Sequence, residues 1–78
     1  MSNTEKEVRQ VLETVFSRPI GDDEPFSAKT EPTWDSLRQV EIILAVEGAL
    51  DIRFEEDEMA ALDSLEKLVR SVKRHRAA

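Results

Sequence analysis

The stretch that decides the fold is DSLRQVEIILAVEGAL, residues 35–50. Its apolar side chains recur at helical spacing and cover more than half of the helix circumference: Leu37, Val40, Ile42, Ile43, Leu44, Val46 and Leu50. This pattern predicts a helix that starts at Asp35 or Ser36 and is the most buried one of the domain. Asp35 is a suitable N-cap, Leu37 is expected to turn inward onto the core, and Gly48 is expected to fray or bend the last turn.

A second amphipathic helix is predicted over residues 4–17. One stripe of it holds the apolar side chains Val8, Val11, Leu12, Val15 and Phe16. Thr4 and Glu7 have the spacing of a capping box, and Pro19 and Gly21 would end the helix.

The third main helix is predicted near the C-terminus, with Asp63 or Ser64 as its cap. Its apolar side chains are Leu65, Leu68, Val69 and Val72. Its last turns are rich in cations: Arg70, Lys73, Arg74 and Arg76. Cations at this end of a helix favour the negative pole of its dipole.

A long loop is predicted from Arg18 to Trp34, where prolines and a glycine interrupt any period. Ile20, Phe26 and Trp34 are apolar enough to hold this loop against the core. Because a loop of this length can cross a whole bundle, the two helices that it joins need not be hairpin neighbours.

The chain after Leu50 adds the last, smaller element. Residues 51–54 predict a short extended link, and residues 55–61 predict a helix of one to two turns with Met59 and Leu62 inward. The predicted fold class is therefore all-α: a four-helix bundle with three main helices, one short helix and a long first loop.

The composition predicts one small acidic domain over residues 1–78. The net charge of −6 divides into −11 over residues 1–66 (6 basic, 17 acidic) and +5 over residues 67–78 (5 basic, none acidic). The acidic body predicts attraction to basic protein surfaces and no binding to nucleic acid. No apolar run is long enough to span a bilayer, so we expect a soluble cytoplasmic monomer. A chain of this size has no room for a deep enclosed active site.

Few residues suit enzyme or metal chemistry. Cysteine is absent, and the single histidine, His75, lies in the basic tail, where we expect a solvated side chain. The run Glu55-Glu56-Asp57-Glu58 lacks the alternating ligands and the glycine of a calcium loop, and we interpret it as a solvated face for basic partners. We therefore expect no metal site and no catalytic residue.

The most informative motif is Asp35-Ser36-Leu37, at the start of the central helix. A phosphate ester on Ser36 would lie beside the free N–H groups and the positive dipole end of that helix, which favour an anion. The motif is also compatible with a simple helix start, and the same tripeptide recurs at residues 63–65. The tripeptide alone is therefore weakly specific, and its surroundings distinguish the two copies.

With its surroundings, the first copy resembles the acyl carrier protein family, and the resemblance covers nearly the whole chain, residues 8–72. The residues that match the family motif and the helix after it are Asp35, Ser36, Leu37, Val40, Glu41 and Glu47. In that family the motif serine receives a 4'-phosphopantetheine arm, whose thiol holds acyl groups as thioesters. The resemblance implies attachment to Ser36 by a separate phosphopantetheinyl transferase, with Asp35 helping that enzyme to hold magnesium. Residues 63–65 are implied to be a helix cap only.

The resemblance also implies two surfaces. Partner docking is expected on the helix that starts at Asp35 or Ser36 and on the short helix over residues 55–61, at Arg38, Glu41, Glu47, Glu55, Glu56 and Met59. An acyl pocket is expected from Val40, Leu44, Val46, Phe54, Met59, Leu62 and Leu68. Met59 and Leu68 stand where relatives often have small residues, which predicts a shallow pocket for a short or polar acyl group, or for none.

Three features depart from the housekeeping members of that family. Arg38 and Gly48 replace expected acids, so the docking face is less negative, and Trp34 precedes the motif in place of a small residue. Of these features, Trp34 looks more like carriers dedicated to specialised pathways than like the housekeeping carrier. The basic end, residues 70–76, is also unusual, and it is interpreted either as dipole compensation or as a partner site.

The leading hypothesis is a free-standing, non-catalytic carrier of acyl, or aminoacyl, intermediates in a specialised lipid or secondary-metabolite pathway. Its partners would be the phosphopantetheinyl transferase and the ligases, synthases or transferases that load acyl or aminoacyl groups. The alternative is a helical interaction or scaffold domain that is never modified and binds a stable partner through its acidic face. A third possibility, an acid-rich metal enzyme, is disfavoured by the absence of ligand spacing.

Overall fold

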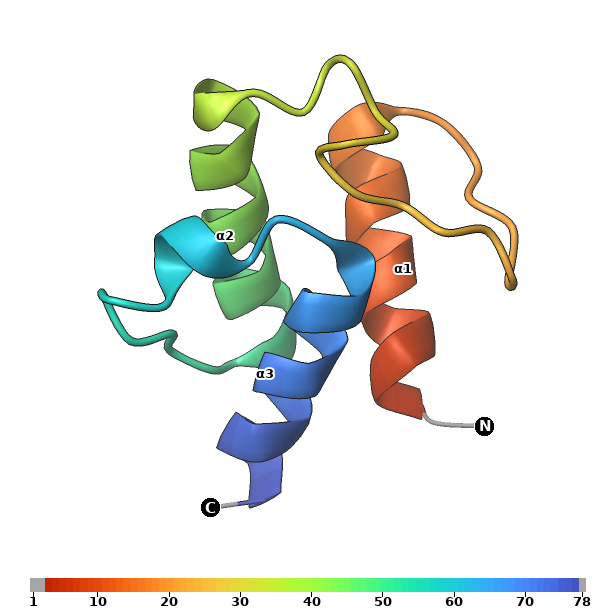
Figure 1. Cartoon of the computed structure of the whole chain (residues 1–78). Coiled ribbons are helices and arrows are strands. Elements are labelled where there is room, and N and C mark those ends of the chain that lie inside the picture. The colour runs from red at the N-terminus through yellow and green to blue at the C-terminus, as the bar shows by residue number, and fades with distance from the viewer. Residues whose placement is uncertain (1–2, 78) are drawn as a thin grey trace.

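Three α-helices and one 3₁₀ turn form the regular secondary structure of the computed structural model, which describes residues 3–77 (Figure 1). α1 comprises Asn3–Phe16, α2 Ser36–Leu50 and α3 Leu65–Ala77, and the 3₁₀ turn η1 covers Met59–Ala61. The prediction of an all-α fold is confirmed over these residues. None of the described helices is long and apolar enough to cross a membrane.

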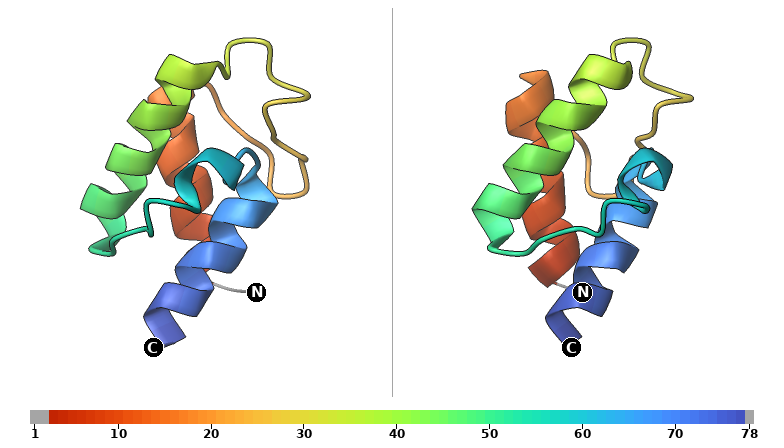
Figure 2. Two further views of the ribbon diagram at one scale, coloured as in Figure 1. Left: turned by 60° about the vertical axis from the view of Figure 1, so that its left-hand side comes forward. Right: turned by 90° about the vertical axis from the view of Figure 1, so that its left-hand side faces the viewer.

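The helices are arranged around α1, which runs antiparallel to α2 and packs against both α2 and α3 (Figure 1). α2 and α3, by contrast, make few direct contacts with each other. The chain that leaves α2 passes between these two helices through residues 54–62, here called the crossing segment (Figure 2). The first two helices are thus antiparallel neighbours despite the long loop between them.

The predicted apolar stripes of α1 and α3 form most of the core. Val8 and Leu12 of α1 are fully buried. The rest of the α1 stripe is partly buried against them: Val11, Val15 and Phe16. All four predicted residues of α3 are buried: Leu65, Leu68, Val69 and Val72. Full burial of one such side chain stabilises the folded state by about 1.5–3 kcal/mol, and the periodicity predictions for these two helices are confirmed.

α2 is less buried than predicted. Only Ile42, Ile43 and Val46 are buried in it, against five residues of α3, so the expectation of the most buried helix is wrong. The apolar side chains of α2 surround so much of its axis that the core cannot cover them all. Its last turn is regular through Gly48, and Asp51, in the left-handed conformation (φ 54°), ends it.

Two further boundaries differ from their predictions. α1 begins at Asn3, so Thr4 lies in the first turn and not at the predicted cap position. Residues 55–61 form turns and the single 3₁₀ turn η1, which corrects the predicted helix of one to two turns. Residues 51–54 form no strand.

The loop over residues 17–35 is anchored by its aromatic side chains. Ile20, Phe26 and Trp34 are buried, as predicted. The ring centroids of Phe26 and Trp34 lie 5.8 Å apart, and both rings contact Phe16 of α1, at 5.0 and 5.6 Å. This cluster fixes the end of α1 to the residue that precedes the Asp-Ser-Leu motif.

Hydrogen bonds hold the middle of the loop. Arg9 of α1 is 8% exposed, and its guanidinium donates to the carbonyl oxygens of Gly21 and Glu24. Residues 26–28 pair with residues 63–65 through two backbone hydrogen bonds of 2.8 and 2.9 Å. The loop therefore reaches the start of α3 before it returns to α2.

Candidate functional site

Ser36 is the first residue of α2, and its side chain is exposed. Asp35 caps the helix as predicted, because its Oδ1 accepts a hydrogen bond from Arg38 N at 2.9 Å. The preceding Trp34 is buried, and its Nε1 donates to Gln39 Oε1 at 2.6 Å. The tryptophan and the cap therefore hold this turn in place while the serine faces solvent.

The Ser36 hydroxyl makes no hydrogen bond to any other residue in the range 3–77, and no base contacts it. The cap occupies the N–H of Arg38 and leaves the N–H groups of Ser36 and Leu37 available. Available N–H groups and the positive end of the helix dipole favour an anion at this place. The turn therefore fits a phosphate ester on Ser36, whereas it lacks the base that a self-activated nucleophile requires.

Three large aliphatic side chains on α2, the first of them next to Ser36 in the sequence, face solvent. They form the outer stripe of α2: Leu37, Val40 and Leu44, which are 71%, 55% and 62% exposed. Their spacing of three and four residues places them in one row along the helix. The prediction that Leu37 turns inward is therefore wrong. A row of exposed aliphatic side chains is typical of a binding surface.

The sequence pattern contained a signal for this surface. Apolar residues cover more than half of the circumference of α2, and a helix at the edge of a small domain buries only one side. Some of them had to be exposed. Periodicity alone does not say which, because the polar residues Arg38, Gln39, Glu41 and Glu47 are spread around the helix and mark no single solvent side.

The side chains of two predicted docking residues form contacts within the fold. The Arg38 guanidinium lies 5.4 Å from the Phe16 ring centroid and donates to Val15 O at 3.3 Å, which fastens it to the end of α1. Glu47 Oε2 accepts a hydrogen bond from Phe54 N at 2.9 Å, which fastens the chain that leaves α2. Both side chains stabilise the fold.

The other predicted docking residues divide into surface and core. Glu41, Glu55 and Glu56 are exposed. Met59 is partly buried and packs against the core. The exposed acidic groups among these residues are therefore Glu41 on α2, whose carboxylate lies 3.5 Å from the Arg38 guanidinium, and Glu55 and Glu56 at the start of the crossing segment.

Glu58 does not belong to the solvated face that was predicted for residues 55–58. Its carboxylate accepts hydrogen bonds from Ser71 Oγ at 2.6 Å, from the Arg74 guanidinium and from Glu55 N at 2.7 Å, and it lies 2.8 Å from His75 Nε2. Burial alone would raise the pKa of Glu58, but the bonds from Ser71, the Glu55 N–H and His75 lower this pKa to about 2. His75, only 20% exposed, is not the solvated side chain that was expected.

The predicted acyl-pocket residues are not all on one side of α2. Four of them are buried: Val46, Phe54, Leu62 and Leu68. Met59 packs against this group. Val40 and Leu44 belong to the outer stripe, so they do not share the interior space of the others.

The second copy of the tripeptide, residues 63–65, has another geometry. Ser64 is itself the cap, since its Oγ accepts a hydrogen bond from Lys67 N at 3.1 Å. A hydrogen bond from Lys67 Nζ at 3.0 Å lowers the pKa of Asp63. Leu65 is buried. The Ser64 hydroxyl is thus engaged by its own helix.

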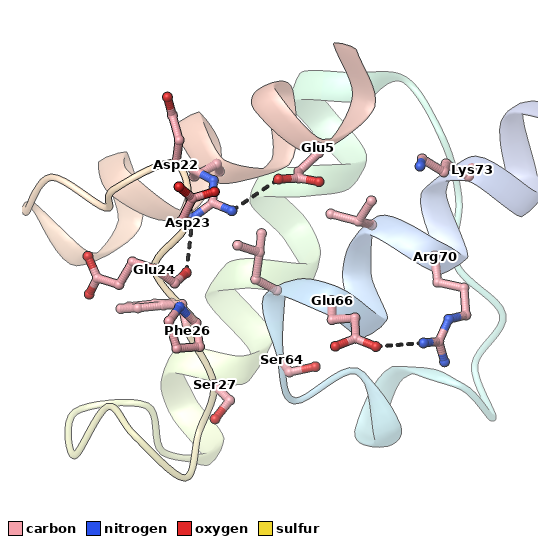
Figure 3. A pocket seen from close by; sticks show the side chains of 14 residues that line it. Glu5, Asp22, Asp23, Glu24, Phe26, Ser27, Ser64, Glu66, Arg70 and Lys73 are labelled. Carbon is pink, nitrogen blue, oxygen red and sulfur yellow. Dashed lines mark hydrogen bonds and ion pairs between the residues drawn. The ribbon is translucent and has the colours of Figure 1, made fainter. Parts of the chain in front are cut away.

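A groove of about 710 Å³ lies between α1, the loop residues 22–27 and the first turns of α3 (Figure 3). Ser64 lies on its wall, and so does the ion pair of Glu66 with Arg70, at 2.8 Å. Charged side chains of both signs line it, and none of the residues predicted for attachment, docking or acyl binding does. The groove therefore adds no chemistry to Ser36.

Within residues 3–77, no group of three or more histidine, aspartate or glutamate side chains is placed to hold a metal ion. Comparison with models of known protein families finds no match for the chain. A search of curated proteins finds no similar sequence either. The function is therefore inferred from the residues of this chain alone.

Proposed function

We propose that this protein is an acyl-carrier-like protein that bears a 4'-phosphopantetheine arm on Ser36. The arm would supply a thiol that holds acyl or aminoacyl groups as thioesters. The observation that best supports the proposal is the exposed Ser36 hydroxyl, without a partner among the described residues, at the N-terminus of α2 and beside the outer stripe. On this proposal the bundle is acyl-carrier-like, and the protein works in the cytoplasm in a specialised pathway.

The residues around Ser36 present the hydroxyl and do not activate it. Asp35 caps the first turn by accepting a hydrogen bond from Arg38 N, and the buried Trp34 anchors this turn by donating to Gln39 Oε1. In the proposed modification, Ser36 Oγ would form a bond to the phosphorus atom of coenzyme A that is attached to the pantetheine. The bond from this phosphorus to the bridging oxygen of the nucleotide part would break, and the nucleotide would leave. The transferase accepts the hydroxyl proton, so no base is needed in this chain.

The outer stripe supplies a docking surface for the enzymes that act on the arm. Each of them has to approach Ser36, and Leu37, Val40 and Leu44 are the apolar groups beside it. Exposed carboxylates at Glu41 and at the start of the crossing segment add negative charge. A partner surface with an apolar patch and a rim of lysine and arginine is complementary to this arrangement. Charge-steered encounters of this kind are fast and need not be tight.

Intact-mass measurement tests the proposal. The chain is incubated with coenzyme A, magnesium and a broad-specificity phosphopantetheinyl transferase. The wild type and Ser64→Ala should each gain the mass of one phosphopantetheine group, whereas Ser36→Ala should gain none. Ser64 is a matched control because it stands in the same tripeptide at the start of a helix.

Two outcomes would overturn the assignment. One is an unchanged mass of the wild type, which would favour the alternative of an unmodified interaction domain. The outer stripe is the observation that supports that alternative, since exposed aliphatic side chains also suit a permanent partner. The other outcome is a mass gain that persists in Ser36→Ala and is lost in Ser64→Ala.

A further inference from the structure

The crossing segment is the main bridge between α2 and α3, which make few direct contacts. α2 holds both ends of it. Phe54 N donates to Glu47 Oε2 at 2.9 Å, and Gln39 Nε2 donates to the carbonyl oxygens of Met59 and Leu62, each at 2.9 Å. The bonds to α2 are thus spread along the segment.

The bonds to α3 converge on one side chain. Within the described part of the chain, every hydrogen bond and ion pair between the crossing segment and α3 ends on the carboxylate of Glu58. The donors are Ser71, Arg74 and His75 on the last turns of α3. The Glu58 side chain is 14% exposed, so water does little to replace these bonds if they are lost.

Apolar side chains lie under the crossing segment. Phe54 and Leu62, at its two ends, are 3% and 6% exposed, and Met59 is partly buried. The rings of Phe54 and His75 also pack in a T-shaped arrangement, with centroids 5.8 Å apart. Movement of the segment away from α3 would therefore uncover the apolar interior between α2 and α3.

We propose that the basic end of α3 is a clasp, in which Ser71, Arg74 and His75 hold Glu58 and thereby keep the crossing segment closed over the core. Release of this one carboxylate opens the segment while α1, which packs on both other helices, stays folded. The clasp gives the cations at the end of α3 a function beyond compensation of the helix dipole. It concerns the unmodified chain and does not depend on the proposed role of Ser36.

Amide hydrogen exchange tests the clasp on the full chain. The reporters are the amides of Ala61 and Leu62, which donate to carbonyl oxygens inside the segment, and the amides of α1 serve as the internal reference. Glu58→Gln keeps the shape of the side chain and removes its charge. Because loss of a charge-assisted hydrogen bond changes an equilibrium by about tenfold or more, exchange of the reporters should quicken by at least about tenfold while that of α1 does not.

Arg74→Ala and Arg70→Ala form the matched pair of variants. Arg74 is largely exposed and bonds to Glu58, whereas Arg70, one turn earlier, pairs within residues 3–77 with the exposed Glu66 alone. Arg74→Ala should quicken the reporters several-fold, and Arg70→Ala should leave them unchanged. The clasp is refuted by reporters that stay unchanged in both Glu58→Gln and Arg74→Ala, or by equal quickening of the reporters and of α1. If Glu58→Gln does not fold, Arg74→Ala decides alone.

Discussion

The starts of α2 and α3 have the same tripeptide, Asp-Ser-Leu, and opposite surroundings. At α2 the aspartate is the cap, the serine hydroxyl has no hydrogen-bond partner among the described residues, and Leu37 is 71% exposed. At α3 the serine is the cap, and Leu65 is 5% exposed. The loop pairs with residues 63–65 through its backbone. No such pairing covers the start of α2 within the described residues.

The difference arises from a shift of one residue in where the helix begins. Leu37 is the second residue after its cap, Asp35, whereas Leu65 is the first residue after its cap, Ser64. Because successive helical residues point about 100° apart, the two leucines point to different sides of their helices. The neighbouring chain then decides which side is buried. A short motif therefore specifies a helix start, while exposure of its serine depends on the segments that pack around it.

The largest expected effect is a difference in stability between the two leucines. Leu65→Ala should lower the free energy of unfolding by about 2–4 kcal/mol, because it leaves a cavity in the core. Leu37→Ala should change it by less than about 0.5 kcal/mol, because the side chain is already in water. Urea unfolding followed by Trp34 fluorescence measures both. Equal losses would show that the two starts do not differ in burial.

The second effect concerns the far end of α3, which Glu58 holds. The folded-state pKa of Glu58, about 2, lies below its ordinary value of 4.5. The folded chain therefore binds fewer protons than the unfolded chain between these values. The carboxylate contributes about 2–3 kcal/mol of stability above pH ~4.5, and this is lost as the pH falls towards ~2.

The measurement is the free energy of unfolding in urea at several pH values between ~5 and ~2. In Glu58→Gln the group no longer titrates, so the variant should start less stable than the wild type and lose less stability on acidification. A variant with the full acid dependence of the wild type would mean that Glu58 does not anchor α3.

How much of the fold and of the candidate site the sequence predicts depends on how far apart in the sequence the contacting residues lie. The stripes of α1 and α3 are narrow, so their periodicity alone predicts the apolar side chains that pack in or against the core, though not the burial of Arg9 and Ser71. Asp35 is found as a cap from its position before the apolar run. Leu37 was placed wrongly because the apolar face of α2 is too wide for its period to define an inner side. For the candidate site, the sequence pattern predicted the helix start at Asp35 and Ser36 but not the exposure of the outer stripe.

The contacts of Glu58 with Ser71, Arg74 and His75 could not be predicted from the sequence pattern. Glu58 lies 13 to 17 residues from its partners on α3, and a local pattern does not report such distances. In the sequence, Glu58 belongs to an acidic run, and Arg74 and His75 belong to a basic tail. Only the path of the crossing segment brings the two runs together.

The smallest effect tests the exchange of capping roles directly. Ser64→Ala should cost about 1 kcal/mol of stability, since it removes a cap, whereas Ser36→Ala should cost nearly nothing. For the aspartates the order reverses: Asp35→Ala should cost about 1 kcal/mol, and Asp63→Ala, which removes only a surface pair with Lys67, less than about 0.5 kcal/mol. Urea unfolding of the four variants at one neutral pH gives the two orders. If the serine substitution costs more stability than the aspartate substitution in both copies, the serine is the cap in both. The two helices would then begin at the same position of the tripeptide, and the exposure of Ser36 would need another cause.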